Sequence, residues 1–303
     1  MEIINSINDI KLQAPTAVTV GSFDGIHLGH QQILQQLKEQ ASSCECLSTL
    51  VTFHPHPKQV LGHRVELLTP LPEKLPLLQK LGLDVLVIIP FTHEFSKMNY
   101  RQFVQEILIQ KIGMKKMVVG YDHAFGRNRE GSTHQLQELK KELDFSVTII
   151  PPHRVGNELI SSSRIREFIH LTQMQKVAQL LGRPYSMLGE VEKGEHRGTN
   201  LGFPTANIHP IHEEKLIPQN GVYAVDIILE GQRYKGMMNI GHRPTFNFDP
   251  LTLEVHIFNF SGLIYGSTLE IIFKKFIRVE KKFASPEALK KQISKDKEMC
   301  LKI

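Results

Sequence analysis

Apolar runs and amphipathic stretches alternate along the first half of the chain. The runs are short and rich in Val and Ile, as in buried strands, and the stretches between them have helical spacing. The strand-like runs are Ala17–Val20, Leu47–Phe53, Val85–Phe91, Lys116–Gly120 and Ser146–Pro151. The helix-like stretches are His30–Gln40, Pro72–Leu81, Tyr100–Ile112 and Gln135–Leu143. This alternation predicts parallel strands with crossover helices, that is, a doubly wound, Rossmann-like α/β sheet that binds ligands at the carboxyl ends of its strands.

The pattern changes after one more helical stretch, Gln175–Leu181, and the sequence Gly182-Arg183-Pro184. From there strand-like runs follow one another, separated by Gly-containing turns, and no helical period returns until the end of the chain. These runs are Val222–Leu229, Tyr234–Asn239, Leu253–Phe260 and Leu269–Arg278. Ser285 and Pro286 predict the N-cap and first turn of a terminal helix. We therefore expect two domains, 1–182 with the parallel sheet and 183–303 with an antiparallel β-barrel or sandwich and the terminal helix.

Composition and charge favour a two-domain protein of the cytoplasm. The length of 303 residues favours two domains, and the longest strongly apolar run, Val85–Phe91, is too short to span a membrane. No basic segment followed by an apolar one opens the chain, and 3 cysteines cannot build a disulfide framework. The net charge of +5 is spread along the sequence, which suits small phosphate-bearing ligands and gives little support to nucleic-acid binding. The oligomeric state, a homo-oligomer included, stays open.

A first candidate site lies where the first predicted strand runs into a helix, in the sequence Gly21-Ser22-Phe23-Asp24-Gly25-Ile26-His27-Leu28-Gly29-His30. His27 and His30 straddle the helix start and face one way, and Gly29 between them leaves room for a phosphate. The unpaired N–H groups of a helix N-terminus favour an anion at the same place. Such a site can stabilise the charge that builds on a nucleotide's α-phosphate during in-line displacement. The alternative is a glycine-rich turn with two surface histidines.

A second candidate phosphate site opens the helix that follows the fifth predicted strand, in the sequence Ser161-Ser162-Ser163-Arg164-Ile165-Arg166. Hydroxyl and guanidinium groups at a helix N-terminus suit the β- and γ-phosphates of ATP. The alternative is an N-cap with solvent-facing arginines.

The two motifs together, in this order, resemble the nucleotidyltransferase superfamily that carries the His-x-Gly-His signature. The resemblance implies that His27, His30 and Arg166 are catalytic. It implies that ATP is bound by Gly21, Phe23, Asp24, Gly29, Ser162, Ser163 and Arg164.

Two loops between these motifs resemble the substrate side of the bacterial FAD-forming members. Gly120–Arg127, after the fourth strand, resembles the segment placed against FMN, and Phe53-His54-Pro55-His56-Pro57 resembles a second such loop. The resemblance implies that Asp122, Phe125 and His56 bind flavin, whereas histidines that only line the loop are the alternative for the second segment. The two prolines of that segment predict an extended, rigid loop. Because the FMN phosphate is already an anion, positioning and charge neutralisation would carry most of the catalysis.

In the second half, a glycine-spaced loop that ends in Pro-Thr-Ala-Asn is the candidate site. Gly194, Gly198 and Gly202 fit neither a P-loop nor a dinucleotide-binding fingerprint, because the spacing differs and no helix follows. Such a loop still brings backbone N–H groups close to phosphates. Thr205 and Asn207 alternate along an extended segment, so their side chains point one way. Their oxygens are ligands that Mg²⁺ accepts beside ATP phosphates.

The run Leu253-Glu254-Val255-His256-Ile257 alternates, with its aliphatic side chains on one face and Glu254 and His256 on the other. From this pattern alone, Glu254 is interpreted as a solvated strand residue.

The whole second half, with Gly221-Val222-Tyr223-Ala224, Asn239-Ile240-Gly241 and Pro244-Thr245-Phe246, resembles the riboflavin kinase family. The resemblance implies that Thr205 and Asn207 hold Mg²⁺ and ATP, and that Glu254 takes the proton of the ribityl 5′-hydroxyl. It further implies ATP contacts from Gly194, Arg197, Gly198 and Gly202, and flavin contacts from Tyr223 and Asn239.

The two halves in this order resemble the bacterial bifunctional riboflavin kinase/FMN adenylyltransferases, the FAD synthetases. The resemblance implies that riboflavin is phosphorylated to FMN and FMN is adenylylated to FAD, with ATP as the donor in both steps. One departure affects the kinase loop: many relatives have Arg directly after the glycine at position 198, where this chain has Thr199. Arg197 is the obvious substitute, and the ATP affinity of the kinase is left open.

Two other functions compete with this interpretation. An adenylyl- or cytidylyltransferase acting on pantetheine phosphate or a polyol phosphate would explain the first half only, and would leave the Pro-Thr-Ala-Asn loop and Glu254 without a role. A flavin- or RNA-binding module would use the barrel and the positive charge but neither phosphate site. Consumption of ATP in the presence of riboflavin separates the enzyme from the binding module.

Overall fold

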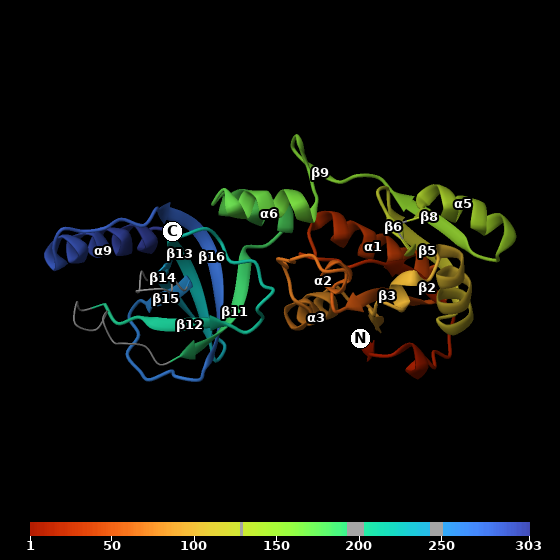
Figure 1. The fold of residues 1–303 in the computed structure, drawn as a ribbon, viewed down its shortest axis with the longest axis horizontal. Helices are drawn as coiled ribbons and strands as arrows, with labels where there is room; N and C mark the ends of the chain where they lie inside the picture. The colour runs from red at the N-terminus through yellow and green to blue at the C-terminus, as the bar shows by residue number, and fades with distance from the viewer. Residues whose placement is uncertain (128–129, 193–202, 243–250) are drawn as a thin grey trace. The chain divides into compact units, whose positions relative to one another are not determined.

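The computed structural model describes residues 1–127, 130–192, 203–242 and 251–303. Internal contacts divide the chain into two units, Met1–Ser161 and Ser162–Ile303, each with its own hydrophobic core (Figure 1). The division falls before the domain boundary predicted at residue 182. Helices α6 (Ser162–His170) and α7 (Met174–Leu181) group with the second unit, where α7 lies against the barrel strands β11 and β16. The domain boundary itself stays a prediction.

The first unit is built on a parallel sheet of 6 strands in the order β1-β4-β3-β2-β5-β8. The strands are β1 (Glu2–Ile4), β2 (Thr16–Val20), β3 (Leu47–His54), β4 (Val85–Pro90), β5 (Met114–Gly120) and β8 (Ser146–Ile150). The prediction of a parallel α/β sheet is confirmed. Strand β1 was not predicted, because its 3 residues are too few to show a period.

Helices cover both faces of this sheet (Figure 1). Along β4, Val85, Val87 and Ile89 belong to one apolar cluster, and Leu86 and Ile88 belong to the other. The first cluster includes residues of the π-helical η3 (Phe103–Lys111) and of α5 (Thr133–Glu142). The second includes residues of α1 (Leu28–Ser42) and α3 (Leu71–Lys80). Burial on both faces explains why these strands read as continuous apolar runs.

Short elements complete the first unit. They are η1 (Ile7–Asp9), α2 (Pro57–Val60), η2 (Phe95–Lys97), α4 (Tyr100–Gln102), the pair β6 (Ala124–Phe125) with β7 (Gly131–Ser132), and the pair β9 (Arg154–Val155) with β10 (Glu158–Leu159). Cys44 and Cys46 after α1 are joined by a disulfide, which the sequence did not predict, and Cys300 is buried.

The second unit contains a closed antiparallel barrel, as predicted, with the strand order β11-β12-β15-β14-β13-β16. Its strands are β11 (Tyr185–Glu192), β12 (Ala206–Pro210), β13 (Gly221–Leu229), β14 (Gln232–His242), β15 (Leu251–Ile257) and β16 (Thr268–Arg278). Strands β11 and β12 were not predicted. β12 is short and has a single aliphatic residue with a large side chain, Ile208, so its sequence carries almost no strand pattern.

The terminal helix α9 (Pro286–Leu301) begins as predicted, with the Ser285 hydroxyl accepting a hydrogen bond from Ala288 N at 3.2 Å. Ile293 and Cys300 of this helix pack in one apolar cluster with Val222 and Met237 of the barrel. The helix therefore covers the outer face of β13 and β14.

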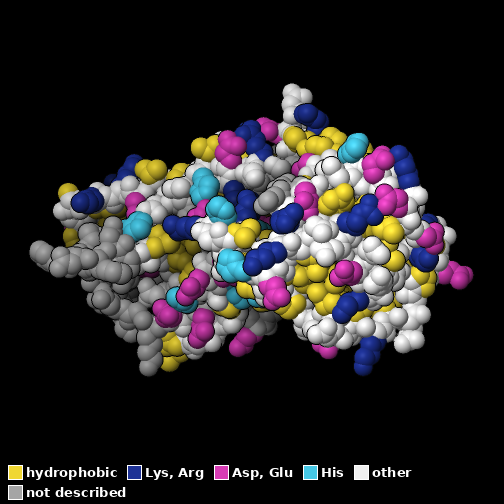
Figure 2. Space-filling view, turned by 45° about the vertical axis from the view of Figure 1, so that its right-hand side comes forward, with side chains coloured by type: hydrophobic (Ala, Val, Ile, Leu, Met, Phe, Trp, Pro, Cys, Tyr) yellow, Lys and Arg dark blue, Asp and Glu magenta, His cyan; other side chains and the backbone are white. Residues whose placement is uncertain are grey.

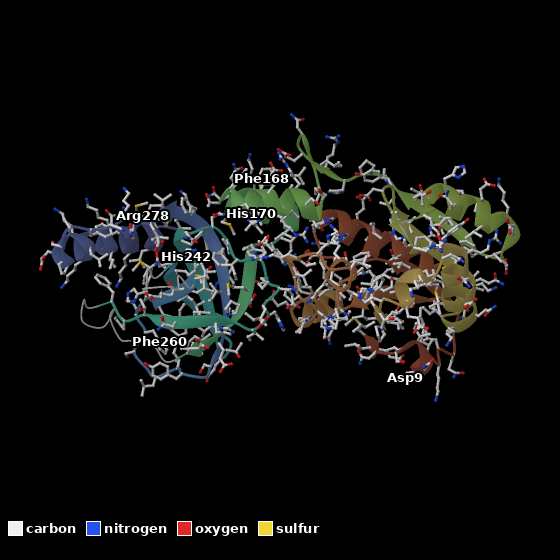
Figure 3. The ribbon with its side chains drawn as sticks, viewed as in Figure 1. Asp9, Phe168, His170, His242, Phe260 and Arg278 are labelled. Atoms are coloured by element: carbon white, nitrogen blue, oxygen red, sulfur yellow. A yellow bond between two sulfur atoms is a disulfide. The ribbon has the colours of Figure 1, made fainter. Side chains whose placement is uncertain are left out.

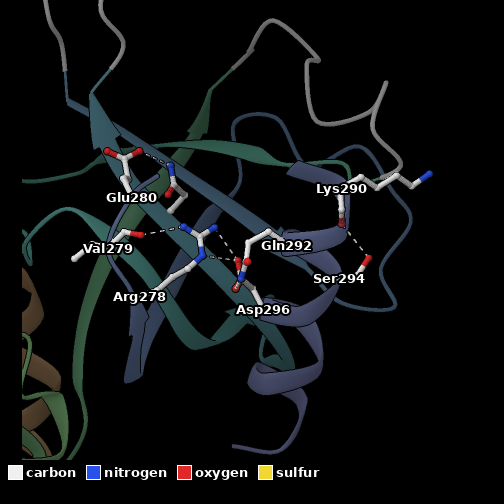
Figure 4. A network of polar contacts seen from close by, with 8 residues as sticks. Arg278, Val279, Glu280, Lys290, Gln292, Ser294 and Asp296 are labelled. Carbon is white, nitrogen blue, oxygen red and sulfur yellow. Dashed lines mark hydrogen bonds and ion pairs between the residues drawn. The ribbon is translucent and has the colours of Figure 1, made fainter. Parts of the chain in front are cut away.

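A buried ion pair ties α9 to the end of β16 (Figure 4). Arg278 Nε and Nη2 lie 2.9 and 2.8 Å from Asp296 Oδ2, and Gln292 Nε2 donates to Asp296 Oδ1 at 2.8 Å. The Asp296 side chain is only 2% exposed and that of Arg278 is 16% exposed.

Replacing Asp296 with Ala would leave the Arg278 guanidinium buried without its partner. We expect the free energy of unfolding of this unit to fall by about 3–5 kcal/mol, the usual cost of breaking a buried pair from one side. Denaturant unfolding measures the change, with Glu298→Ala, an exposed acid on the same helix, as the matched control. Equal stability of the two variants would contradict a structural role for the pair.

Charges of both signs mingle on the face seen in Figure 2, where Lys and Arg side chains alternate with Asp and Glu. The net charge of +5 is therefore not gathered in one patch on that face. No helix in the described ranges combines the length and apolarity needed to cross a membrane.

Candidate active sites

The turn between β2 and α1 has an unusual backbone. Phe23 and Ile26 have φ angles of 46° and 41°, in the left-handed region that side chains with a Cβ rarely adopt. Both side chains are buried, 4% and 1% exposed, in the cluster that α1 and α3 form against the sheet. Gln31 Nε2 also donates to Ile26 O at 2.9 Å. Apolar burial and this bond hold the turn in a conformation that would otherwise be costly.

The two histidines of the motif lie against each other at the start of α1. Their rings stack with centroids 3.6 Å apart, and the Phe23 ring lies 4.6 Å from that of His30. His27 is the N-cap, and its Nδ1 accepts from His30 N at 3.2 Å, so its ring proton is carried by Nε2. Burial, and then the charges of His27 and Lys74, hold the pKa of His30 well below its ordinary value. His30 is therefore a neutral N–H donor at pH 7.

Gly29 leaves room beside the stacked rings at the start of α1. A Cβ at this position would lie 3.2 Å from His27 Nδ1 and 3.8 Å from the Cβ of His153. His153, which sequence reasoning did not single out, donates to or accepts from Gln32 Oε1 at 2.6 Å. The start of α1 is thus lined by three histidines around a glycine.

Asp24 is 2% exposed and accepts two backbone hydrogen bonds, from Leu68 N at 3.1 Å and from Thr69 N at 2.9 Å. These bonds fix the chain that leads into α3. Gly21 N donates to Val51 O at 3.0 Å, which closes the end of β2. Both residues were predicted to bind ATP, and both have a structural task in the turn itself.

Lys74, in the first turn of α3, is the charged group that sequence reasoning missed. It is 7% exposed, and its ammonium donates to Ser22 O inside the His-x-Gly-His turn. Burial lowers the pKa of Lys74 to about 8, although the nearby Asp24 carboxylate raises it in part. Its spacing in the sequence could have revealed it, because Lys74 lies three residues after Leu71 and four before Leu78, on the apolar face of the helix.

The segment predicted to face FMN divides between surface and core. Asp122 is exposed at the turn after β5. Phe125 is 7% exposed and belongs to the apolar cluster of η3 and α5, with its ring 5.7 Å from that of Phe103. Its position favours packing beneath the turn over direct contact with a ligand.

The second predicted flavin loop is not extended throughout. Pro57 is the first residue of α2, and His56 is its N-cap, with Nδ1 accepting from Lys58 N at 3.2 Å. The prediction of a rigid extended loop is wrong at this point, because proline also fits the first turn of a helix.

The second phosphate motif opens a helix, as predicted, with Ser162 as the first residue of α6. Ser163 is exposed and Arg166 is partly buried. Arg164 Nη1 bonds Glu167 Oε2 at 2.7 Å, and its guanidinium lies 4.4 Å from the ring centroid of Phe168, a residue labelled in Figure 3. Because α6 belongs to the second unit, a shared ATP between this motif and the histidine turn stays a prediction.

In the barrel, three predicted site residues form a row across adjacent strands. Asn207 of β12 and Asn239 of β14 are both register partners of Glu254 in β15, which lies between them. Leu253 and Val255 are 4% and 0% exposed inside the barrel, so Glu254 and its two partners point outward. Side chains in such positions have Cβ atoms about 4.5–5.5 Å apart. The predicted position of Glu254 on the polar face is confirmed.

Thr205 precedes β12 by one residue and is partly buried, two positions from Asn207. Thr205 lies on the same side of the extended segment as Asn207, the register partner of Glu254, and the side-chain oxygens of these residues are hard donors of the kind that Mg²⁺ accepts beside nucleotide phosphates. No group of three or more His, Cys, Asp or Glu side chains within the described ranges forms a metal cluster of its own.

Two further predicted residues have neighbours that the sequence did not indicate. Asn239 Nδ2 donates to Glu280 Oε1 at 3.3 Å, so a carboxylate that was not predicted adjoins the row (Figure 4). Tyr223 is 0% exposed inside the barrel, with its ring 5.5 Å from that of Phe273 and its hydroxyl donating to Gln219 O at 2.5 Å. This position favours core packing over flavin contact. Burial raises its pKa.

The remaining predicted residues of the kinase loop lie outside the described residues. They are Gly194, Arg197, Gly198 and Gly202, together with Thr199.

Comparison with known proteins gives matches over both units. The FAD synthetase family model matches residues 9–164, and the riboflavin kinase family model matches residues 181–303. A bifunctional riboflavin kinase/FMN adenylyltransferase of Listeria monocytogenes is 38% identical over 93% of this chain and 90% of its own. Its counterpart in Escherichia coli is 33% identical over 98% and 96%. The crystal structure of a macrolide-efflux protein from Streptococcus pneumoniae superposes with a TM-score of 0.90, at 30% identity over 99% of both chains.

A parallel α/β sheet with a His-x-Gly-His turn, followed by a closed barrel with a Pro-Thr-Ala-Asn segment beside a carboxylate, defines a two-unit phosphate-transferring protein. The chain belongs to the family of bifunctional riboflavin kinases/FMN adenylyltransferases, because it matches members of that family over nearly the full length of both chains.

Proposed function

We propose that this chain makes FAD from riboflavin in two ATP-dependent steps, with the phosphorylation at the barrel and the adenylylation at the parallel-sheet unit. The observation that carries the proposal is the outward row of Asn207, Glu254 and Asn239, which places a carboxylate beside the Pro-Thr-Ala-Asn segment. The stacked pair His27 and His30 supports the second step.

In the kinase step, Glu254 takes the proton of the ribityl 5′-hydroxyl as the oxygen attacks the γ-phosphorus of ATP. The new O–P bond forms as the bond between the γ-phosphorus and the β,γ-bridging oxygen breaks, and ADP leaves. Asn239, held by Glu280, lies next to Glu254 and orients the ribityl 5′-hydroxyl. Asn207 and Thr205, on the other side of Glu254, bind the ATP phosphates.

The metal of this step is Mg²⁺, held by Thr205 and Asn207, and it supplies neutralisation of the charge on the ATP phosphates. The ligands of the chain are otherwise small molecules, namely riboflavin, FMN and ATP. A cytoplasmic location belongs to the same proposal.

In the adenylyl step, an oxygen of the FMN phosphate attacks the α-phosphorus of ATP, and the bond to the α,β-bridging oxygen breaks, which releases pyrophosphate. The nucleophile needs no base because it is already ionised. His27 and His30 donate N–H hydrogen bonds to the α-phosphate as its charge builds. The start of α1 adds backbone N–H groups on the same side.

Arg164 and Arg166, with Ser162 and Ser163, would bind the β- and γ-phosphates during adenylylation. Arg166→Ala should then raise the KM for ATP of FAD formation about tenfold or more, since a charge-assisted contact is lost. Arg166→Lys should rescue poorly where the contact is bidentate. Steady-state kinetics with FMN supplied measures the effect, with His170→Ala, exposed on the same helix, as the control. An unchanged ATP dependence in both Arg164→Ala and Arg166→Ala would make the arginines surface residues.

Lys74 should contribute its charge to the same step. Lys74→Met should lower kcat/KM of FAD formation about 10- to 100-fold, the typical cost of one hydrogen bond to a charged group. Its pKa of about 8 means that the ammonium form predominates below that pH. We therefore expect kcat/KM to fall as the pH rises through about 8, and Lys74→Arg to remove this fall. A pH profile of FAD formation measures both, and an alkaline limb that persists in Lys74→Arg would contradict the assignment.

The proposed function is tested by incubating the purified chain with riboflavin, ATP and Mg²⁺ and separating the flavins by chromatography. FMN should form first and FAD should follow, with one ATP consumed in each step. Flavin binding without ATP consumption would indicate a binding module. Adenylylation of another phosphate ester, with riboflavin untouched, would indicate a different nucleotidyltransferase.

A further inference from the structure

His256 of β15 lies beside the proposed kinase residues, on the face that its strand pattern predicts, but it is buried where that pattern predicts exposure. Its position alternates with Val255 and places it on the outer face with Glu254, where the sequence predicts an open surface. It is nevertheless only 6% exposed. The Phe203 and Phe258 rings lie 5.5 and 5.4 Å from its imidazole, both edge-on.

The imidazole holds the backbone that leads into β12. Its Nδ1 lies 2.7 Å from Pro204 O, a carbonyl that can only accept, so Nδ1–H is the donor. The backbone ladder between β12 and β15 ends at the pair Ala206 and Val255. The hydrogen bond of His256 to Pro204 O therefore joins β15 to the chain before β12, two residues beyond the last ladder pair, with Thr205 between the two attachment points.

We propose that His256 is a positioning residue for phosphoryl transfer to riboflavin, which fixes the segment Pro204–Asn207 through its bond to Pro204 O. The inference rests on the proposed function, in which Thr205 and Asn207 hold Mg²⁺ and ATP. Thr205 lies between two fixed points, the clamped carbonyl of Pro204 and the paired backbone of Ala206. Its hydroxyl is thereby directed to one place before ATP arrives, which lowers the cost of ordering the site on binding.

The second ring nitrogen of His256, Nε2, indicates that this side chain does more than fill space in the apolar cluster. His256 Nε2 is buried and has no hydrogen-bond partner within the described ranges. Burial, and also the charge of Lys297, lower the pKa of His256, against the opposing effect of its bond to Pro204. The ring is therefore neutral, with a desolvated lone pair on Nε2, which is unfavourable for stability. An apolar side chain would fill this space at lower cost, so the useful feature is the Nδ1–H donor.

Two substitutions separate positioning from packing. His256→Asn keeps an N–H donor near the place of Nδ1, whereas His256→Leu fills the space and removes both nitrogens. We expect His256→Leu to raise the KM for Mg·ATP in FMN formation about five- to tenfold, as for one lost hydrogen bond. Its KM for riboflavin, its melting temperature and its rate of FAD formation from supplied FMN should stay near those of the parent. His256→Asn should restore most of the ATP affinity.

The matched control is His209→Leu, since His209 lies on β12 itself with its side chain 60% exposed. An unchanged KM for Mg·ATP in His256→Leu would overturn the inference. So would an Asn variant as impaired as the Leu variant, or a loss of melting temperature with all kinetic constants moving together. Thr205→Val, measured beside them, tests the proposed function separately. If Thr205→Val keeps the parent's kinase activity, the metal site is wrong; if it is impaired and His256→Leu is not, only the role of His256 is wrong.

Discussion

Replacing Glu254 with Gln should lower the rate of FMN formation about 10²–10⁴-fold, because Gln keeps the shape of the side chain but cannot accept the hydroxyl proton. Glu254 points out of the barrel between Asn207 and Asn239, so the substitution leaves the core residues Leu253 and Val255 untouched. The free energy of unfolding should therefore change little. FAD formation from supplied FMN should persist, since its nucleophile is already ionised.

The measurement is the initial rate of FMN formation from riboflavin at saturating ATP, together with thermal unfolding. Glu270→Gln is the matched control, since Glu270 also points outward from a barrel strand, between the buried Leu269 and Ile271 of β16. A Glu254→Gln variant that phosphorylates riboflavin near the parent rate would leave Glu254 a solvated strand residue and remove the proposed base.

His30→Ala should reduce FAD formation about 10²–10³-fold, the usual loss when one group that stabilises transition-state charge is removed. The ring stacks on His27 and contacts Phe23 in a turn that α1 and α3 keep closed. Because the low pKa of His30 keeps it neutral above pH 6.5, the lost activity should be similar across neutral and alkaline pH. FMN formation should stay near the parent rate.

The loss is measured as the single-turnover rate of FMN adenylylation, monitored through pyrophosphate release, with FMN supplied so that the kinase step is not needed. His134→Ala is the control, an exposed histidine on α5 of the same unit. Equal losses of FMN and FAD formation in His30→Ala would indicate damaged folding rather than a catalytic contact.

The elements with clear periods were predictable, and those that depend on distant partners were not. Strand β4 and the middle of β3 are buried on both faces, and their runs of strand-forming residues were visible in the sequence. Strand β13 is also buried on both faces. Because α9 covers its outer face, Val222 and Ala224 are buried outside the barrel while Tyr223 is buried inside, and alternation no longer tells which residue meets a ligand.

The site residues divide in the same way. His27, Gly29 and His30 are neighbours in sequence, so local spacing was enough to bring them together. Lys74 bonds Ser22 from 52 positions away, and Asp24 bonds Thr69 from 45 positions away. No local pattern encodes such contacts, except that a lysine on the apolar face of a helix must find a polar partner. The buried ring of His256 likewise depends on Phe203 and Pro204, which come from another strand connection.

The closed barrel limits how this kinase unit can change in length. Strand β15 is paired on both sides, with β12 and with β14, so it has no free edge along which to slide. Deleting one residue within β15 would turn Glu254 toward the core and Val255 toward the substrate, because successive side chains alternate between faces. Insertions and deletions should therefore be tolerated in the connections between strands, such as that from Phe258 to Ser267. Within β12, β14 and β15 they should abolish kinase activity. Within these three strands, substitution is the kind of change that leaves the row Asn207–Glu254–Asn239 intact.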